Sequence, residues 1–291
     1  MFVTDNRLSS VKKYFKNALE SHFSASEIRF MFNLFCEKRL QLSEAYFSFE
    51  ENMVSESDLL YFRSVTKRLL AGEPFQQIIG FALFYDLRIH VTPDVLIPRP
   101  ETEELARKIV ADCSEKRQEN LKIIDVCSGS GCIALSLKNK LKYASVFGLE
   151  KSEQALSVAQ KNAQYLQLDV NFQTCDVLHE KWNFTATSID VIVSNPPYVL
   201  QEEKVAMSDT VLNYEPHLAL FVENDDPLLF YRKIGHKGQE LLKQNGYLYF
   251  EINEKYGKEV ADLLKNQGYE NVEILCDLEG KERMIKSQKT T

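Results

Sequence analysis

The stretch from Asp190 to Tyr198 restricts the fold of this 291-residue chain more than any other. Residues 190–194 read Asp-Val-Ile-Val-Ser, and consecutive β-branched apolar residues are typical of a parallel strand buried on both faces. An Asn-Pro-Pro-Tyr motif follows at 195–198, and its prolines end the strand because neither has an N–H group to donate. We therefore expect Asn195 at the carboxyl end of a sheet strand, where open α/β sheets bind their ligands.

The chain after residue 120 alternates between strand and helix patterns. Short apolar runs predict further strands at 122–126, 144–149, 171–174, 246–252, 272–276 and 283–286. Apolar residues at helical spacing predict helices at 133–137, 155–166, 227–242 and 256–264. Strands that alternate with helices predict an α/β fold with a doubly wound, mostly parallel sheet.

The corner at 195–198 offers a specific set of chemical groups. Asn195 supplies an amide side chain, Pro196 and Pro197 leave outward carbonyls, and Tyr198 supplies an aromatic face. Two acceptors and an aromatic face suit a planar ligand that carries an NH2 group. The alternative is that the motif only ends the strand, because Asn-Pro commonly begins a turn.

A glycine loop follows the predicted strand at 122–126. Its residues are Cys127, Ser128, Gly129, Ser130 and Gly131. Such a loop lets a ligand approach the backbone at the N-terminus of a helix. Glu150 lies 19 residues beyond Gly131 at the end of the next strand, where a carboxylate takes ribose hydroxyls. Asp176-Val177 follows a third strand and is placed to meet a base. We expect an adenosine-containing cofactor, and the alternative is a structural turn with a solvated glutamate.

NAD is the second candidate cofactor, because Gly129-x-Gly131-x-x-Ala134 also matches a dinucleotide fingerprint. That interpretation leaves the motif at 195–198 unexplained, and the chain offers no obvious acid for hydride transfer. No metal site is predicted, because the five histidines are dispersed along the sequence.

Composition narrows the class of protein and of partner. Hydrophobic residues make up 44% of the chain and charged residues 26%, which is typical of a globular protein with a large core. The net charge of −7 disfavours binding to a nucleic-acid backbone, which relies on lysine and arginine. The six cysteines are scattered without a C-x-x-C pair, which favours reduced thiols. Without a recognisable signal peptide or spanning segment, we expect a cytoplasmic protein with no direct nucleic-acid or membrane partner.

Residues 1–74 predict an N-terminal helical bundle domain. A capping box at Ser24 begins one of its helices, Ser55-x-x-Asp58 precedes another, and a shorter helix is expected after Ser43. The many phenylalanines fall at helical spacing, and we assign most of them to the core of the bundle.

Residues 75–97 predict a β-hairpin linker, with short strands at 75–79, 81–84 and 87–91 and a tip at Tyr85-Asp86. The domain that carries the ligand site is expected at 98–291. Arg99 and Glu101 lie beside an apolar run at its start, so they form either a structural salt bridge or a wall of the active site.

From about Gly72 to Lys286 the chain resembles the release factor glutamine N5-methyltransferases of the HemK/PrmC type. The Asn-Pro-Pro-Tyr motif alone is shared with DNA adenine methyltransferases, and its pairing with the upstream Ile-Pro-Arg-Pro-Glu-Thr-Glu is much more specific. The residues that carry the resemblance are Gly72-x-Pro74, Gly80, Leu96 to Glu103, Asp125-x-Cys127-x-Gly129-x-Gly131, Asn195 to Tyr198, Glu215-Pro216-x-x-Ala219-Leu220, Asp277-Leu278 with Gly280, and Arg283.

The resemblance implies a seven-stranded, Rossmann-like methyltransferase sheet and S-adenosylmethionine as the methyl donor. The implied substrate is the glutamine side chain of the Gly-Gly-Gln loop in class 1 peptide chain release factors. The implied cofactor residues are Cys127, Ser128, Gly129, Ser130, Gly131, Glu150, Asp176, Val177 and Asn195. The implied substrate residues are Asn195, Pro196, Pro197 and Tyr198, of which Asn195, Pro196 and Tyr198 are assigned to catalysis.

Two residues depart from the pattern of the family. Cys127 stands where the family usually has glycine, and Glu150 stands where it usually has aspartate. Because cysteine is small and glutamate keeps the carboxylate, we expect slight changes in the fit of the cofactor and no loss of binding.

Three other functions stay open at this point. A ribosomal protein glutamine N5-methyltransferase would share the chemistry, and a DNA adenine N6-methyltransferase would share the motif at 195–198. Negative charge and the lack of an evident DNA-recognition domain disfavour the second. A catalytically silent protein that binds release factors through its helical domain is disfavoured by the intact cofactor fingerprint.

Overall fold

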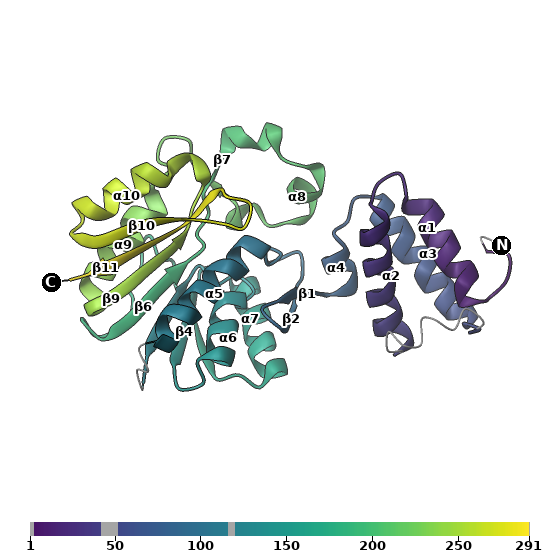
Figure 1. The fold of residues 1–291 in the computed structure, drawn as a ribbon, viewed down its shortest axis with the longest axis horizontal. Helices are drawn as coiled ribbons and strands as arrows, with labels where there is room; N and C mark the ends of the chain where they lie inside the picture. Colours follow the sequence, from purple (N-terminus) through teal and green to yellow (C-terminus); the bar gives the residue numbers. More distant parts are fainter. Residues whose placement is uncertain (1–2, 42–51, 116–119, 291) are drawn as a thin grey trace. The chain divides into compact units, whose positions relative to one another are not determined.

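The computed structural model describes residues 3–41, 52–115 and 120–290. The chain divides into two compact units, one of Met1–Gly80 with Asp209–Tyr214 and one of Phe81–Ser208 with Glu215–Thr291. The first unit is helical, and the second is built on a twisted sheet (Figure 1). Among the described residues, every helix is too short or too polar to span a membrane.

The helical unit contains α1 (Leu8–Leu19), α2 (Ala25–Leu40), α3 (Glu56–Leu70) and α4 (Phe75–Ile79). The predicted capping box at the start of α2 is confirmed, and the predicted start of α3 after Ser55 also has one. The side chains of Ser24 and Glu27, and likewise of Ser55 and Asp58, exchange hydrogen bonds with each other's backbone N–H groups. Two of the orphan amide donors at each helix start are thereby satisfied.

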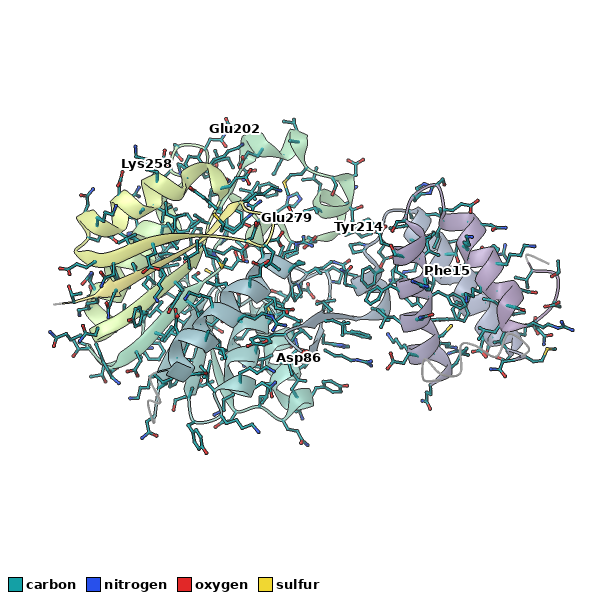
Figure 2. All side chains as sticks on the ribbon, viewed as in Figure 1. Phe15, Asp86, Glu202, Tyr214, Lys258 and Glu279 are labelled. Atoms are coloured by element: carbon teal, nitrogen blue, oxygen red, sulfur yellow. The ribbon has the colours of Figure 1, made fainter. Side chains whose placement is uncertain are left out.

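Phenylalanines form the core of this unit, as the spacing predicts. Phe15, Phe32, Phe35 and Phe62 are each at most 2% exposed. The ring centroids of Phe15 and Phe32 lie 5.5 Å apart, within the range favoured by aromatic pairs. Phe15 is seen on α1 among the side chains between the helices (Figure 2). The helix expected after Ser43 lies outside the described residues.

The expectation of a strand at 75–79 is wrong, because these residues form α4. Pro74 precedes the helix, and Gly80 ends it with a φ of +84°, a left-handed conformation that glycine adopts without strain. Short apolar runs fit helix and strand equally well, so periodicity alone could not separate the two.

A segment from the second half of the chain completes the helical unit. It is α8 (Asp209–Tyr214), whose Tyr214 hydroxyl donates to the Ala71 carbonyl at 3.1 Å. The Gln77 side chain donates to the Tyr214 carbonyl at 2.7 Å. Because 137 positions separate Gln77 from Tyr214, no local sequence pattern predicts this association.

The hairpin at the start of the second unit is confirmed. β1 (Phe81–Phe84) pairs antiparallel with β2 (Leu87–His90), and Tyr85 and Asp86 form the tip with φ values of +44° and +68°. Positive φ at both central residues is the geometry of the two-residue turns that match the twist of a hairpin.

A seven-stranded sheet within the described residues organises the second unit, with the order β10-β11-β9-β6-β3-β4-β5. The five neighbouring strands β9, β6, β3, β4 and β5 run parallel to one another, and β11 is antiparallel to β9 and to β10. The strands are β3 (Lys122–Val126), β4 (Ser145–Glu150), β5 (Val170–Thr174), β6 (Ile189–Ser194), β9 (Leu242–Glu251), β10 (Tyr269–Cys276) and β11 (Glu282–Lys289). The predicted doubly wound, mostly parallel sheet is therefore confirmed.

Helices cover both faces of the sheet (Figure 1). They are α5 (Pro100–Glu115), α6 (Cys132–Lys140), α7 (Glu153–Leu166), α9 (Leu229–Leu241) and α10 (Gly257–Asn266). Ile123 and Val191 pack with α5, α6 and α7 on one face, whereas Ile124 and Ile192 pack with α9 and α10 on the other. This alternation follows from the two-residue period of a strand. It explains why these strands read as continuous apolar runs.

The strand order places a ligand crevice at the ends of β3 and β6. β3 lies between β4 and β6, so the chain leaves β3 towards one side of the sheet and later returns to its other side. Open α/β sheets bind ligands outside the carboxyl ends of the strands at such a switch point.

Candidate active site

The Asn-Pro-Pro-Tyr corner lies beside the end of β3, as expected. β6 ends at Ser194, whose buried hydroxyl donates to the Val126 carbonyl at 2.6 Å and joins the two strand ends. Beyond the corner, β7 (Val199–Leu200) pairs in parallel with β8 (Phe221–Val222). The corner is therefore fixed on both sides, by the sheet before it and by a short two-stranded ribbon after it.

A cavity of about 280 Å³ opens at this switch point. Of the Asn-Pro-Pro-Tyr motif, Asn195 and Pro197 line the cavity, whereas Pro196 and Tyr198 do not. From the predicted cofactor residues, it is lined by Cys127, Gly129, Glu150, Asp176 and Val177. One apolar-walled space thus adjoins both the glycine loop and the Asn-Pro-Pro-Tyr corner.

The glycine loop alternates left-handed residues. Cys127, Gly129 and Gly131 have φ values of +62°, +55° and +78°. A Cβ atom on Gly131 would lie 2.7 Å from the Phe172 ring, so only glycine fits there. A Cβ on Gly129 would meet nothing within 4 Å, because this residue faces open space. The loop therefore exposes backbone to the cavity at Gly129 and packs tightly at Gly131.

Ser128, Ser130 and Gly131 hold the shape of the loop and do not line the cavity. The Ser128 hydroxyl donates to the Asp125 carbonyl at 2.8 Å, and the Gly131 N–H donates to the Ser128 carbonyl at 2.8 Å. The buried Asp125 carboxyl accepts from the Ala134 N–H at 3.1 Å in the first turn of α6. Burial raises the pKa of Asp125 to about 7, although the hydrogen bond from the Ala134 N–H favours the carboxylate.

Glu150 ends β4 and joins the loop to the next helix. Its carboxylate accepts hydrogen bonds from the Gly129 N–H and from the Ser152 N–H, each at 2.8 Å. A carboxylate has about four acceptor positions, so two remain for a diol. Glu150 is half-buried and lines the cavity, which is where a ribose would need it.

Asp176 lies at the far wall of the cavity. Lys151 forms an ion pair with its carboxylate at 2.9 Å, and His179 Nδ1 lies 3.0 Å from the same oxygen. Burial opposes ionisation of Asp176, but the hydrogen bonds from Lys151, His179 and the Leu178 N–H lower its pKa to about 2. The neighbouring Val177 is buried and gives this wall an apolar face.

Arg99 takes part in a structural ion pair that joins two walls of the cavity. Its guanidinium donates to the carboxylate of Glu215, which is only 5% exposed. The Ile97 N–H donates to the other oxygen of Glu215 at 3.1 Å. The adjacent Leu96 and Pro216 line the cavity, whereas Arg99 does not. Sequence left two interpretations of Arg99 open, and this geometry favours the structural one.

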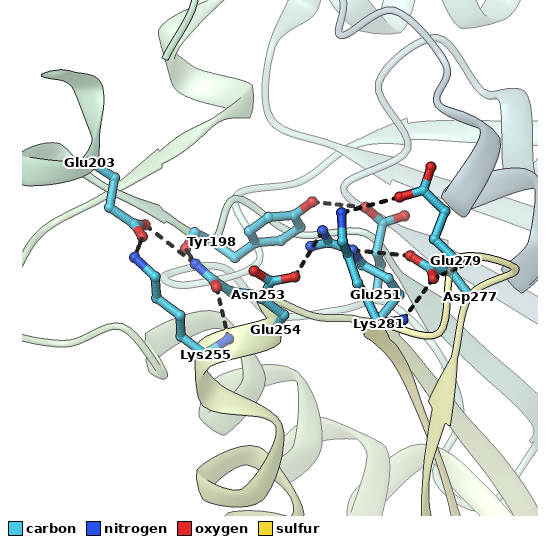
Figure 3. A network of polar contacts seen from close by, with 10 residues as sticks. Tyr198, Glu203, Glu251, Asn253, Glu254, Lys255, Asp277, Glu279 and Lys281 are labelled. Carbon is cyan, nitrogen blue, oxygen red and sulfur yellow. Dashed lines mark hydrogen bonds and ion pairs between the residues drawn. The ribbon is translucent and has the colours of Figure 1, made fainter. Parts of the chain in front are cut away.

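Two polar residues beside Asn195 were not predicted to have a role in the site. Thr102 in α5 accepts a hydrogen bond from the Asn195 amide nitrogen at 3.0 Å, and its own hydroxyl donates to Glu251 at 2.6 Å. Glu251 also accepts from the Tyr198 hydroxyl at 2.9 Å (Figure 3). The available signal for Glu251 was an acid at the end of a buried strand. The sequence marks Thr102 only as part of the motif from Leu96 to Glu103.

The cavity also has apolar walls that sequence reasoning did not find, including Leu178, Leu218 and Phe230. They come from loops and from α9, where no local pattern marks them as part of a site. Within the described ranges, no group of three or more histidine, cysteine, aspartate or glutamate side chains could hold a metal ion.

Comparison with known proteins supports one family. A model described as "Methyltransferase domain" matches residues 117–286. The chain is 41% identical to the release factor glutamine methyltransferase of Flavobacterium psychrophilum over 96% of this chain and 98% of that protein. It is 38% identical to the protein of the same name from Bacteroides thetaiotaomicron over 96% and 99% of the two chains.

A solved structure shares the fold of this chain. The crystal structure of a methyltransferase from Pyrococcus furiosus aligns with a TM-score of 0.51 and 18% identity, over 78% of this chain and 99% of that one. At this identity the likeness concerns the fold alone. The curated relatives match at much higher identity and along almost their whole length, so the chain belongs to the release factor glutamine methyltransferase family.

Proposed function

We propose that this protein transfers a methyl group from S-adenosylmethionine to the side-chain amide nitrogen of the glutamine in the Gly-Gly-Gln motif of class 1 peptide chain release factors. The observation that carries the proposal is the hydrogen bonding of the Asn195 carboxamide beside the cavity. Its nitrogen already donates to Thr102, so its oxygen is the free polar atom available to a ligand. A free acceptor at this point suits an NH2 group.

The chemistry requires orientation more than acid–base catalysis. The amide nitrogen of glutamine is a weak nucleophile because its lone pair is delocalised into the carbonyl. Holding it in line with an electrophilic methyl group can supply roughly 7–11 kcal/mol. The Asn195 oxygen and the Pro196 carbonyl would accept its two N–H bonds and direct the lone pair towards the methyl group. Those bonds strengthen as the nitrogen gains positive charge, which stabilises the transition state.

The residues of the glycine loop fit the implied cofactor. Gly129 leaves open space above its backbone, Glu150 has two unused acceptor positions, and Val177 offers an apolar face to a base. The cavity of about 280 Å³ is close to the lower end of the range for small-molecule sites. When bound, S-adenosylmethionine supplies the activated methyl group and the leaving group. Asp176 would accept from the edge of the base, next to its bond with Lys151.

The roles of Pro197 and Tyr198 are supporting ones. Pro197 lines the cavity and stiffens the corner, since its ring fixes φ. Tyr198 packs partly against the core of β6 and β9, and we assign it to one face of the planar amide, as the resemblance implies. The proposal therefore assigns catalysis to Asn195, Pro196 and Tyr198, with Asn195 as the residue on which it depends most.

The test is incubation of the purified protein and a purified release factor with S-adenosylmethionine that carries an isotopically labelled methyl group. Mass spectrometry of the digested release factor should place one labelled methyl group on the glutamine of Gly-Gly-Gln. Label on a large-subunit ribosomal protein or on plasmid adenines, with none on the release factor, would overturn the proposed substrate. A release factor with alanine in place of that glutamine is the matched control and should stay unlabelled.

A further inference from the structure

We infer that Thr102 and Glu251 are positioning residues. Their hydrogen bonds determine that Asn195 presents its side-chain oxygen to the cavity, and Glu251 also holds the hydroxyl of Tyr198. The inference rests on the proposed function for its kinetic consequences. Its structural content, the orientation of one side-chain amide, can be tested without any substrate.

The three residues come from three separate elements and meet below the cavity. Asn195 follows β6, Thr102 lies in the first turn of α5, and Glu251 is the last residue of β9. The Asn195 nitrogen lies 3.0 Å from the Thr102 hydroxyl, which lies 2.6 Å from a Glu251 oxygen. Thr102 is 3% exposed and Glu251 is 2% exposed, so water does not compete for these hydrogen bonds.

The direction of the chain of hydrogen bonds follows from counting protons. A threonine hydroxyl has one hydrogen, and a carboxylate only accepts. Thr102 therefore donates to Glu251, and the lone pairs of its oxygen accept from the Asn195 NH2 group. A reversed Asn195 would set its carbonyl oxygen against the Thr102 oxygen, with no hydrogen between them. The carboxylate of Glu251 thus determines, through Thr102, that Asn195 presents oxygen to the ligand.

The contacts on Glu251 agree with an accepting carboxylate. Burial raises its pKa, but the hydrogen bonds from Thr102 and Tyr198 act in the opposite direction because they stabilise the charged form. Burial and then the charge of Glu251 raise the pKa of Tyr198 well above its ordinary value. Tyr198 therefore stays protonated, and its hydroxyl donates a hydrogen bond to Glu251. Because each of its two oxygens accepts a hydrogen bond from a hydroxyl, Glu251 acts here as an accepting carboxylate.

Tyr198 is held at two points by the end of β9. Its hydroxyl donates to Glu251 at 2.9 Å, and its backbone carbonyl accepts from the Asn253 side chain at 3.4 Å (Figure 3). Asn253 in turn donates to Glu203 at 3.3 Å, and Glu203 pairs with Lys255. The corner after β6 is thus fixed by the residues at and just after the end of β9.

The test compares Thr102→Val with Thr102→Ser. Valine keeps the shape of threonine without the hydroxyl, and serine keeps the hydroxyl without the methyl group. With S-adenosylmethionine saturating, we expect Thr102→Val to lower kcat for release factor by roughly 10- to 100-fold, as expected for loss of one buried hydrogen bond in the transition state. Thr102→Ser should retain most of the wild-type kcat. The Kd for S-adenosylmethionine should change less than about twofold in both, since neither removes a group of the glycine loop.

Glu251→Gln gives an independent readout. Its amide can donate to Thr102, which frees the Thr102 hydroxyl to donate to the Asn195 oxygen and favours the reversed orientation. We expect a loss of kcat similar to that of Thr102→Val. The double variant should lose little more than either single one, because both changes act through the same hydrogen bond. Additive losses would show separate roles and overturn the inference.

The substrate-free arm measures the side-chain amide protons of Asn195 by nitrogen-15 NMR, with the signal identified by its absence in Asn195→Asp. In the wild type and in Thr102→Ser, one proton should exchange with solvent at least about tenfold more slowly than in Thr102→Val. Equal exchange in all three proteins would overturn the inference. So would equal kcat in Thr102→Val and Thr102→Ser. A wild type that leaves release factor unlabelled would reject the proposed substrate, and the exchange rates would still decide the orientation.

Discussion

The two halves of the cavity are built in different ways. The half that we propose for the cofactor, called the cofactor half, consists of backbone in left-handed conformations and one carboxylate, and the bond between Gly129 and Glu150 spans only 21 positions of sequence. The half that we propose for the glutamine amide, called the acceptor half, depends on side chains from three elements, since Asn195 reaches Thr102 across 93 positions and Thr102 reaches Glu251 across 149. The first half is therefore encoded locally, and the second exists only once the sheet has assembled.

Because the two halves are built separately, we expect mutations in them to have separable effects on cofactor binding and on turnover. Changes in the acceptor half should lower kcat much more than cofactor affinity. Changes in the cofactor half should weaken cofactor binding and leave kcat unchanged when the cofactor is saturating. Any residue that moves both quantities would show that the halves are coupled.

Asn195→Ala should have the largest effect. It removes the acceptor that orients the amide nitrogen, and we expect a loss of at least about 2.7 kcal/mol of transition-state stabilisation, by analogy with deletion of one oxyanion donor. Single-turnover kinetics with labelled cofactor would measure it, and isothermal titration would show a smaller loss of affinity for S-adenosylmethionine, because Asn195 is only one of the residues assigned to the cofactor. Wild-type methylation by Asn195→Ala would indicate a different active site, or a binding role without catalysis.

Glu150→Ala should act on the other half. The variant loses the acceptor for ribose hydroxyls and also the bond to the Gly129 N–H, so cofactor affinity should fall about tenfold or more. Glu150→Asp is the matched control, because it keeps the carboxylate and has the residue usual in the family. Titration with S-adenosylmethionine checks both. A loss of kcat at saturating cofactor with an unchanged Kd would contradict the assignment.

Asp125 links the cofactor half to pH. Its carboxyl group is buried beneath the glycine loop, and burial raises its pKa from 3.8 to about 7. The folded protein then binds more protons here than the unfolded chain, so this stabilisation is complete below about pH 4 and is lost as the pH rises to about 7. Relative to Asp125→Asn, the wild type should lose up to about 1.4 kcal/mol per pH unit in this window. Urea unfolding at several pH values measures the difference, and parallel curves would contradict it.

The sequence predicts most of the sheet and the cofactor half because both depend on local patterns. Gly129, Gly131 and Glu150 stand in register with predicted strand ends, and the structure joins Gly129 to Glu150 by a hydrogen bond. Asn195 was found because two prolines mark the end of its strand. Its partners were not, since a threonine in a helix and a glutamate after a strand are common and unremarkable until the chain is folded.

Two features that the sequence does not predict have a similar physical origin. Residues 75–79 were assigned to a strand because five mostly apolar residues carry too little periodicity to separate helix from strand. α8 joins the helical unit through Tyr214 and Ala71, which are 143 positions apart. In both cases tertiary contacts decide the outcome, and local propensity is a weak guide.

Cys127→Gly should have the smallest effect and bears directly on how the cofactor half is built. Cys127 has a φ of +62°, a left-handed conformation that costs an L-residue roughly 1–2 kcal/mol. Glycine relieves this strain but loses about 0.5–1 kcal/mol through its greater freedom in the unfolded chain. The free energy of unfolding should therefore rise by up to about 1.5 kcal/mol, measured by urea titration. Cys127→Ala keeps the strain and should show no such gain. Equal stability of the two variants would mean that the half-buried thiol, and not the backbone, determines the stability of this position.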